Sequence, residues 1–140
     1  MTLAVVFDMD GVLISSEELW DAVREDLARE RGGRWGPGAH EDMMGMSPPE
    51  WTGYMREVVG LPMSPGEIED EVVRRLVDRY RAEPPFIDGA REAVLALAER
   101  FPLGLATSST RALIEAVLSL GGLAGAFTVT VSSEEVARGK

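Results

Sequence analysis

The sequence has no cysteine, only one histidine, and only one lysine among its 140 residues. Without cysteine it can form neither disulfides nor thiolate metal sites. The formal net charge is −10, which disfavours nucleic acid as a partner because phosphate contacts need a basic surface. No apolar run is long enough to span a bilayer, and the pattern of a signal peptide is missing. These absences predict a cytoplasmic protein with no nucleic-acid or membrane partner.

An acidic pair follows the first apolar run of the chain. Hydrophobic residues make up 45% of the sequence, enough for the core of one domain. The run Leu3–Phe7 is rich in β-branched residues and predicts a strand buried on both faces. Asp8 and Asp10 come directly after it, and Gly11 permits a sharp turn there. Two neighbouring carboxylates are costly unless a cation or a reaction uses them, so this turn is the best indication of chemistry.

The next part of the chain, from residue 16 to about 83, has helical patterns and no strand. Ser15–Glu18, Ser47–Glu50 and Ser64–Glu67 each have the form of a helix start, with serine as N-cap and glutamate three residues later. In the first of these, Ser15 is the predicted N-cap. The only histidine, His40, falls in a predicted loop. This region is therefore expected to be a helical insert.

Strand and helix patterns alternate after Pro84-Pro85. A helix capped by Asp88 is expected through Arg100, then a strand over 102–106, a helix over 111–120 and a strand over 127–131. Such alternation predicts right-handed β-α-β crossovers and a parallel sheet. The expected organisation is an α/β core of residues 1–15 and 85–140, interrupted by a helical cap of residues 16–84.

Polar groups stand at the carboxyl ends of all three expected strands, where open parallel sheets bind ligands. They are Asp8 and Asp10, Thr107 and Ser108, and Ser132 and Ser133 leading on to Lys140. Helix N-terminal amides hold anions, and a lysine neutralises charge on a transferring phosphoryl group. One aspartate can attack phosphorus while another serves as general acid and base. Carboxylate and backbone carbonyl oxygens also suit Mg²⁺.

Three segments resemble the motifs of one enzyme family. Phe7–Leu13 and Leu103–Ser109 match the first and second motifs of the haloacid dehalogenase superfamily of phosphatases and phosphomutases, and Arg138-Gly139-Lys140 matches the start of the third. The resemblance covers the whole chain and points to the beta-phosphoglucomutase-like branch, which has a small helical cap inserted after the first motif. It implies a Rossmann-like parallel sheet core.

The same resemblance implies a role for each candidate site residue. Asp8 would be the nucleophile and Asp10 the general acid and base. Thr107, with Ser108 beside it, would bind phosphate, and Lys140 would neutralise its charge. Mg²⁺ would be held by the Asp8 carboxylate and the Asp10 main-chain carbonyl.

The chain departs from the family pattern in two places. Ser15 stands where the family usually has aspartate. Family members also continue well past the third motif, into an acidic fourth motif that completes the Mg²⁺ site and into two further strands. The sequence is therefore expected to be a truncated fragment. Its first strand would then form an exposed hydrophobic edge, which favours self-association.

The expected reaction is Mg²⁺-dependent hydrolysis of a small phosphorylated metabolite through an aspartyl phosphate. A sugar phosphomutase of the same family is the nearest alternative, but such enzymes usually carry a histidine and an arginine in the cap where this chain has Trp20 and Ser47–Pro49. A dehalogenase does not need Asp10. A non-catalytic fragment without the fourth motif also stays open. Trp20, Trp35 and Trp51 are interpreted as packing residues rather than a ligand cage.

Overall fold

The computed structural model describes residues 3–138. Its internal contacts divide the chain into two compact units, Met1–Glu17 with Val77–Lys140, and Glu18–Leu76. The first is called the α/β unit below and the second the helical unit.

The α/β unit contains a three-stranded parallel sheet in the order β1-β2-β3. The strands are β1 (Val5–Phe7), β2 (Leu103–Thr107) and β3 (Val129–Ser132). Their register places Val6 beside Gly104 and Gly104 beside Val129. The predicted α/β class with a parallel sheet is confirmed.

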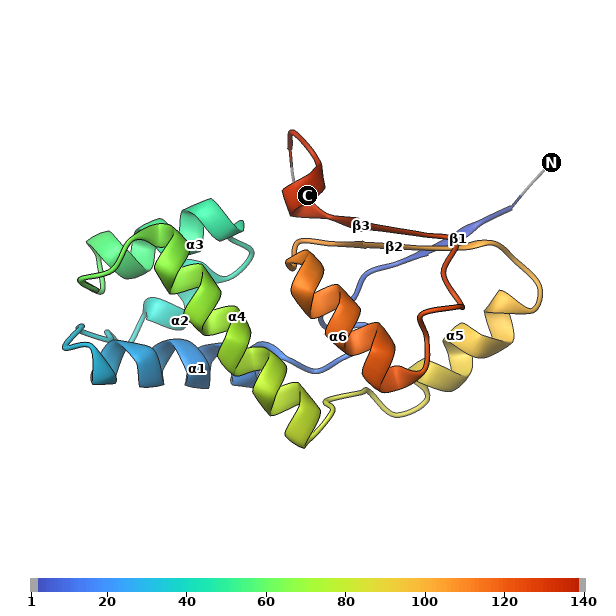
Figure 1. The fold of residues 1–140 in the computed structure, drawn as a ribbon, viewed down its shortest axis with the longest axis horizontal. Coiled ribbons are helices and arrows are strands. Elements are labelled where there is room, and N and C mark those ends of the chain that lie inside the picture. The colour runs from blue at the N-terminus through green and yellow to red at the C-terminus, as the bar shows by residue number, and fades with distance from the viewer. Residues whose placement is uncertain (1–2, 139–140) are drawn as a thin grey trace. The chain divides into compact units, whose positions relative to one another are not determined.

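Two helices connect the strands, α5 (Ala90–Ala98) and α6 (Arg111–Gly121), and the short 3₁₀ helix η1 (Ser133–Glu135) follows β3. Figure 1 shows α5 and α6 on the same side of the sheet, as two right-handed crossovers in one direction require. The N-cap of α5 is Gly89, with a φ of +80° and no side-chain hydrogen bond, so the predicted cap by Asp88 is wrong.

The two faces of the sheet differ in burial. On the face toward the helices, Leu103 and Leu105 are buried and the ring of Phe7 meets that of Phe127 edge to face, 6.0 Å between centroids. On the other face Val6 is 68% and Val129 56% exposed. The prediction that Leu3–Phe7 is buried on both faces is therefore wrong, because both connecting helices cover the same face of the described sheet.

The helices outside the sheet are α1 (Glu17–Glu30), α2 (Ala39–Met43), α3 (Pro48–Glu57) and α4 (Pro65–Ala82). The predicted starts of α3 and α4 are confirmed: Glu50 accepts a hydrogen bond from the Ser47 amide at 2.7 Å, and Glu67 accepts one from the Ser64 amide at 2.8 Å. The N-cap predicted at Ser15 is one residue too early, because α1 begins at Glu17. The buried apolar side chains of the helical unit include Val23, Leu27, Met43, Trp51, Met55, Val59, Leu61, Ile68, Val72 and Leu76.

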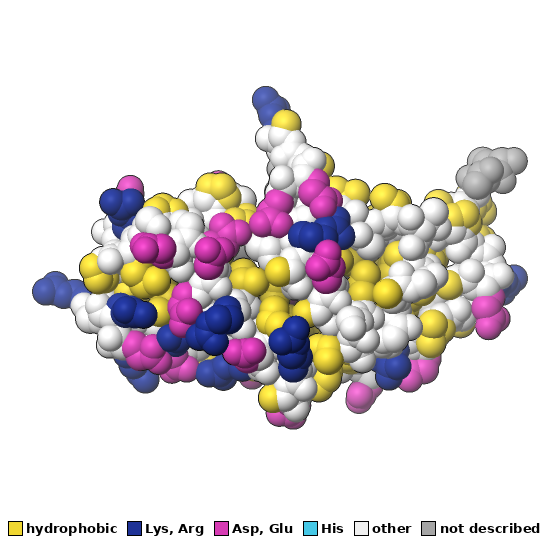
Figure 2. All heavy atoms as spheres, in the orientation of Figure 1, with side chains coloured by type: hydrophobic (Ala, Val, Ile, Leu, Met, Phe, Trp, Pro, Cys, Tyr) yellow, Lys and Arg dark blue, Asp and Glu magenta, His cyan; other side chains and the backbone are white. Residues whose placement is uncertain are grey.

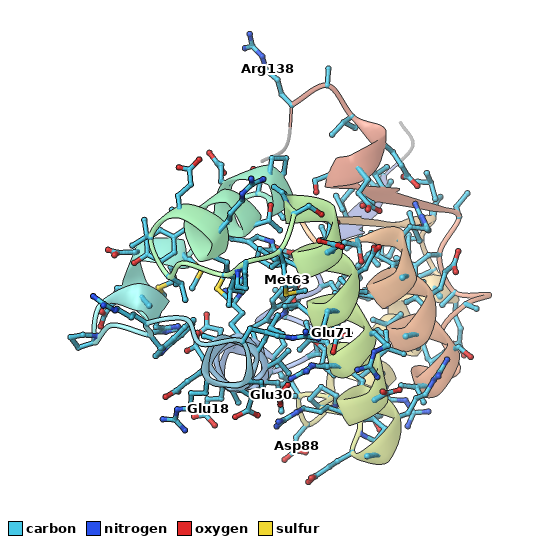
Figure 3. All side chains as sticks on the ribbon, turned by 60° about the vertical axis from the view of Figure 1, so that its left-hand side comes forward. Glu18, Glu30, Met63, Glu71, Asp88 and Arg138 are labelled. Atoms are coloured by element: carbon cyan, nitrogen blue, oxygen red, sulfur yellow. The ribbon has the colours of Figure 1, made fainter. Side chains whose placement is uncertain are left out.

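An arginine joins two helices of this unit through carboxylates. Arg75 of α4 contacts Glu30 of α1 at 2.5 Å and Glu71 of its own helix at 2.7 Å; Figure 3 labels both glutamates. Hydrogen bonds from Arg74 and Arg75 lower the pKa of Glu71 to about 2. Partly exposed charge pairs of this kind add little stability.

The surface carries charges of both signs. On the face drawn in Figure 2, acidic and basic side chains are interspersed rather than gathered into one basic patch. Among the described residues, no helix combines the length and the apolar character needed to cross a membrane.

Candidate active site

The turn after β1 carries Asp8 and Asp10 and is anchored by main-chain atoms. The carbonyl of Met9, a fully buried residue, lies 2.9–3.3 Å from the amides of the three residues 12–14. Gly11 has a φ of +78°, a conformation that favours glycine. Asp8 is exposed, and its carboxylate accepts a hydrogen bond from the Met9 amide at 2.7 Å. The first aspartate is thus oriented by its own backbone.

Asp10 is held by three hydroxyl groups. Ser16 donates to its Oδ1 at 2.7 Å, and Ser109 donates to its Oδ2 at 2.7 Å. Thr107 donates to the same Oδ2 at the longer distance of 3.3 Å. These bonds tie the turn after β1 to the loop after β2, so the structure brings two of the predicted polar groups together.

The loop from Thr107 to Thr110 leads into α6. Thr107 is 4% exposed, and its hydroxyl also accepts a hydrogen bond from the Ser109 amide at 3.1 Å. Thr110 is the N-cap of α6, and its hydroxyl is buried with no hydrogen-bond partner among the residues described. The positive end of an eleven-residue helix therefore lies beside the hydroxyls that reach Asp10.

Arg111 fastens this loop to the end of the sheet. Its guanidinium binds the Thr130 hydroxyl at 2.6 Å and the Glu135 carboxylate at 2.7–2.8 Å. Its backbone amide donates to Glu134 at 2.8 Å. These hydrogen bonds link the start of α6 to both β3 and η1.

The end of β3 also meets the loop after β2. The hydroxyl of Ser132, a fully buried residue, donates to the Ser109 carbonyl at 2.7 Å, and that of Ser133 donates to the Ser108 carbonyl at 2.8 Å. A hollow of about 200 Å³ lies here, lined by Ala106, Thr107, Val131, Ser132, Ser133, Val136 and Arg138. Figure 3 shows Arg138 pointing away from the body of the unit. Lys140 lies outside the described residues.

The structure brings some of the predicted site residues into contact and not others. Asp10 and Thr107 are in direct contact, whereas the Ser108 hydrogen bond described above uses its main-chain carbonyl. Sequence reasoning missed Ser16 and Ser109 as partners of Asp10. The sequence offers a sign of each: Ser16 directly follows the predicted N-cap Ser15, and Ser109 belongs to the same hydroxyl run as Thr107.

Oxygen atoms dominate the site, as a hard cation requires. Within residues 3–138 no group of three or more histidine, aspartate or glutamate side chains is placed to hold a metal ion. The Asp8 carboxylate and the Asp10 main-chain carbonyl remain as oxygen donors. Mg²⁺ commonly uses only one or two protein carboxylates together with water and substrate phosphate, so the donor types present fit this ion.

Comparisons with known proteins agree with the fold and the motifs. A family model described as haloacid dehalogenase-like hydrolase matches residues 2–140. Hexitol phosphatase B of Escherichia coli (strain K12) is 31% identical, and the match covers 96% of this chain and 62% of that protein. The chain therefore belongs to the haloacid dehalogenase-like hydrolases, and it spans 62% of the length of this curated relative.

Solved structures show the same relationship. A putative beta-phosphoglucomutase from Thermotoga maritima is 28% identical with a TM-score of 0.72, and the match covers 100% of this chain and 65% of that one. CbbY from Rhodobacter sphaeroides, solved in complex with phosphate, is 22% identical with a TM-score of 0.82, covering 100% of this chain and 67% of that one. The second likeness concerns the fold alone.

Proposed function

We propose that the protein hydrolyses a small phosphomonoester through an aspartyl phosphate formed on Asp8. The observation that carries the proposal is the pairing of two aspartates with different surroundings in one turn. Asp8 is exposed at the end of β1, while Asp10 is fixed by three hydroxyls from two segments of the chain. A nucleophile needs access to phosphorus, and a proton-transfer group needs a fixed position.

The proposed steps use the residues of the turn in order. The Asp8 carboxylate attacks phosphorus, and the bond between phosphorus and the leaving oxygen breaks. Asp10 gives its proton to that oxygen. Asp10 then takes a proton from water, which attacks the phosphorus of the aspartyl phosphate and releases inorganic phosphate and free Asp8.

The remaining predicted residues would bind the phosphoryl group. Thr107, Ser108 and the amides of α6 that follow Arg111 would provide donors for its oxygens, and Lys140 stays a prediction as the neutralising cation. Mg²⁺ would be held by the Asp8 carboxylate and the Asp10 carbonyl. When bound, it neutralises phosphate charge.

The substrate class rests on the relatives. Hexitol phosphatase B is named for a hexitol phosphate, and one fold neighbour, the CbbY mutant, was solved with xylulose-(1,5)bisphosphate. A small phosphorylated metabolite is therefore the proposed substrate, and a cytoplasmic location stays a prediction. A phosphomutase is the second candidate, because a putative beta-phosphoglucomutase is among the solved structures that match. A product that retains phosphate from a sugar bisphosphate donor would indicate the mutase.

The test is hydrolysis of p-nitrophenyl phosphate by the 140-residue chain with Mg²⁺ and with excess EDTA. Turnover is expected only with Mg²⁺, and Asp8→Asn should abolish it because an amide is a poor nucleophile. The matched control is Asp88→Asn, which removes one exposed carboxylate from the same unit and should leave turnover unchanged. Turnover that persists in Asp8→Asn, or no Mg²⁺-dependent turnover by the unchanged chain, would contradict the proposal.

We also propose that the chain self-associates through its sheet, along the edge strand β1 and the uncovered face beside it. Leu3, Val6 and Val129 are each more than half exposed there or at its edge, and apolar patches of this kind favour protein contacts. Size-exclusion chromatography with light scattering should show a concentration-dependent dimer that Val6→Thr with Val129→Thr weakens. A monomer at every concentration would contradict this.

A further inference from the structure

A buried arginine lies against two tryptophans in the helical unit. Arg24 of α1 is only 8% exposed. Its Cζ is 4.7 Å from the ring centroid of Trp20, one turn earlier, and 4.7 Å from that of Trp51 on α3. The guanidinium is therefore held by rings from two helices.

The two rings do not sandwich the guanidinium. Their centroids are only 5.7 Å apart, and the rings stand nearly perpendicular, at 77°. Both centroids are 4.7 Å from Cζ, so the directions from Cζ to the two rings make an angle well below 180°.

The hydrogen-bonding capacity of Arg24 is also not used up. Its Nε is buried and has no hydrogen-bond partner in the described chain. Asp21, one turn earlier on α1, forms its ion pair with His40 instead, and its Oδ1 is likewise buried and unpartnered within residues 3–138. Burial lowers the pKa of Arg24 to about 10, although the charge of Asp21 acts in the opposite direction.

Packing against aromatic rings does not supply the hydrogen-bond acceptor that the Arg24 Nε–H lacks. A ring satisfies the flat face of a guanidinium by cation–π attraction, whereas the N–H groups point outward in the guanidinium plane and require acceptor oxygens. A buried charged group with unused donors costs free energy. A ligand that supplies two oxygens in one plane would recover that cost.

We propose that Arg24, positioned by Trp20 and Trp51, binds an oxyanion, the phosphate or carboxylate group of a small molecule, in the helical unit. Both groups present the paired oxygens that a guanidinium fork recognises. This binding needs neither Asp8 nor Mg²⁺, so it stands apart from the proposed hydrolysis. It also gives the two tryptophans a role beyond the packing expected from the sequence.

The test is an anion titration followed by two signals from the 140-residue chain without Mg²⁺. The background is Trp35→Phe with Asp8→Asn, so that the fluorescence comes from Trp20 and Trp51 alone and no turnover occurs. Inorganic phosphate and malonate are added in separate arms at constant ionic strength. A saturable change in fluorescence is expected with at least one of them, and the Nε–H resonance of Arg24 should shift over the same concentrations.

Variants separate binding from a purely structural role. Arg24→Met should abolish the saturable change, and Arg24→Lys, which keeps the charge but loses the planar fork, should weaken it roughly tenfold. Arg56→Met removes an exposed arginine of α3 and should leave the affinity unchanged. Circular dichroism checks that each variant is folded, and Arg24→Lys still decides the matter if Arg24→Met is not.

Three results would overturn the proposal. They are no saturable response to either anion, equal affinity in Arg24→Lys and the parent, or an Nε–H resonance that stays in place while the fluorescence changes. The arm with the tighter binding identifies the group as phosphate or carboxylate.

Discussion

Two carboxylate sites of this chain, one in each unit, have partners of different kinds. In the helical unit, Glu71 and Glu30 are held by the guanidinium of Arg75. In the α/β unit, Asp10 is held by the hydroxyls of Ser16, Thr107 and Ser109. An arginine can only donate, so it fixes its partner in the charged form. A hydroxyl can rotate and accept a hydrogen bond instead of donating one, so it can also pair with a protonated carboxyl group. Asp10, the carboxylate proposed for proton transfer, has neutral partners at both of its oxygens.

The strongest test of the two-unit description is to remove one buried side chain from each. Met9 and Met55 are both fully buried, and truncation to alanine should cost about 2–5 kcal/mol of unfolding free energy in each case. Hydrogen exchange should accelerate mainly in residues 3–17 and 77–138 for Met9→Ala, and mainly in residues 18–76 for Met55→Ala. Equal acceleration everywhere in both variants would show that the chain unfolds as one unit.

A glycine pair tests packing in the same two units. A Cβ at Gly121 would lie 2.6 Å from the Phe86 ring, whereas one at Gly53 of α3 would meet nothing within 4 Å. Gly121→Ala should therefore destabilise by about 1–3 kcal/mol, and Gly53→Ala should stabilise by about 0.5–1 kcal/mol through its helix propensity. Urea denaturation measures both. A neutral Gly121→Ala would mean that the ring moves aside freely.

Removing one hydroxyl tests how Asp10 is held. Ser109→Ala deletes a 2.7 Å hydrogen bond to its carboxylate and should cost about 1.5 kcal/mol, the lower range for bonds to charged groups. Turnover of p-nitrophenyl phosphate should fall as well, because Asp10 loses its fixed position. Ser119→Ala, at an exposed position of α6, is the matched control and should change neither quantity appreciably. If Ser109→Ala behaved like its control, the hydroxyls would not position Asp10.

The smallest expected effect concerns the charge pairs of the helical unit. The pKa of Glu71 lies near 2, below its usual 4.5, so its contribution to stability is full above about pH 4.5 and is lost as the pH falls toward 2. Glu71→Gln should cost less than about 1 kcal/mol at pH 7 and should flatten the loss of stability below pH 4.5. Asp70→Asn, at an exposed position of the same helix, serves as control. An unchanged acid profile in Glu71→Gln would show that the pairing adds nothing.

The sequence predicted the positions of helices and strands in both units better than it predicted which of their side chains are buried. The apolar runs and helix-start signals of Ser47 and Ser64 depend on neighbours in the chain, and these elements formed where expected. Burial of Leu3–Phe7 could not be read in the same way, because it depends on which face the connecting helices cover. The apolar run indicates a strand, but not that Val6 is 68% exposed.

The site was predicted in part for the same reason. The sequence places Asp8 and Asp10 directly after a strand, and β2 ends at Thr107, one residue beyond the predicted strand over 102–106. The hydrogen bond from Ser109 joins residues 99 positions apart, and only the sheet register brings them together. The contacts of Arg24 with Trp20 and Trp51 likewise join α1 to α3. The spacing of the tryptophans along the chain therefore gave no sign of these contacts.

Arg111 shows how accuracy at the site can depend on a residue that does not touch Asp10. It binds β3 and η1 at once, from the first turn of the helix that the Thr107–Thr110 loop enters. For that loop to shift relative to β3, several of these bonds would have to break together with those from Ser132 and Ser133. The alignment of the hydroxyls around Asp10 therefore depends on the hydrogen bonds that join the loop to β3 and η1, and not on the loop alone.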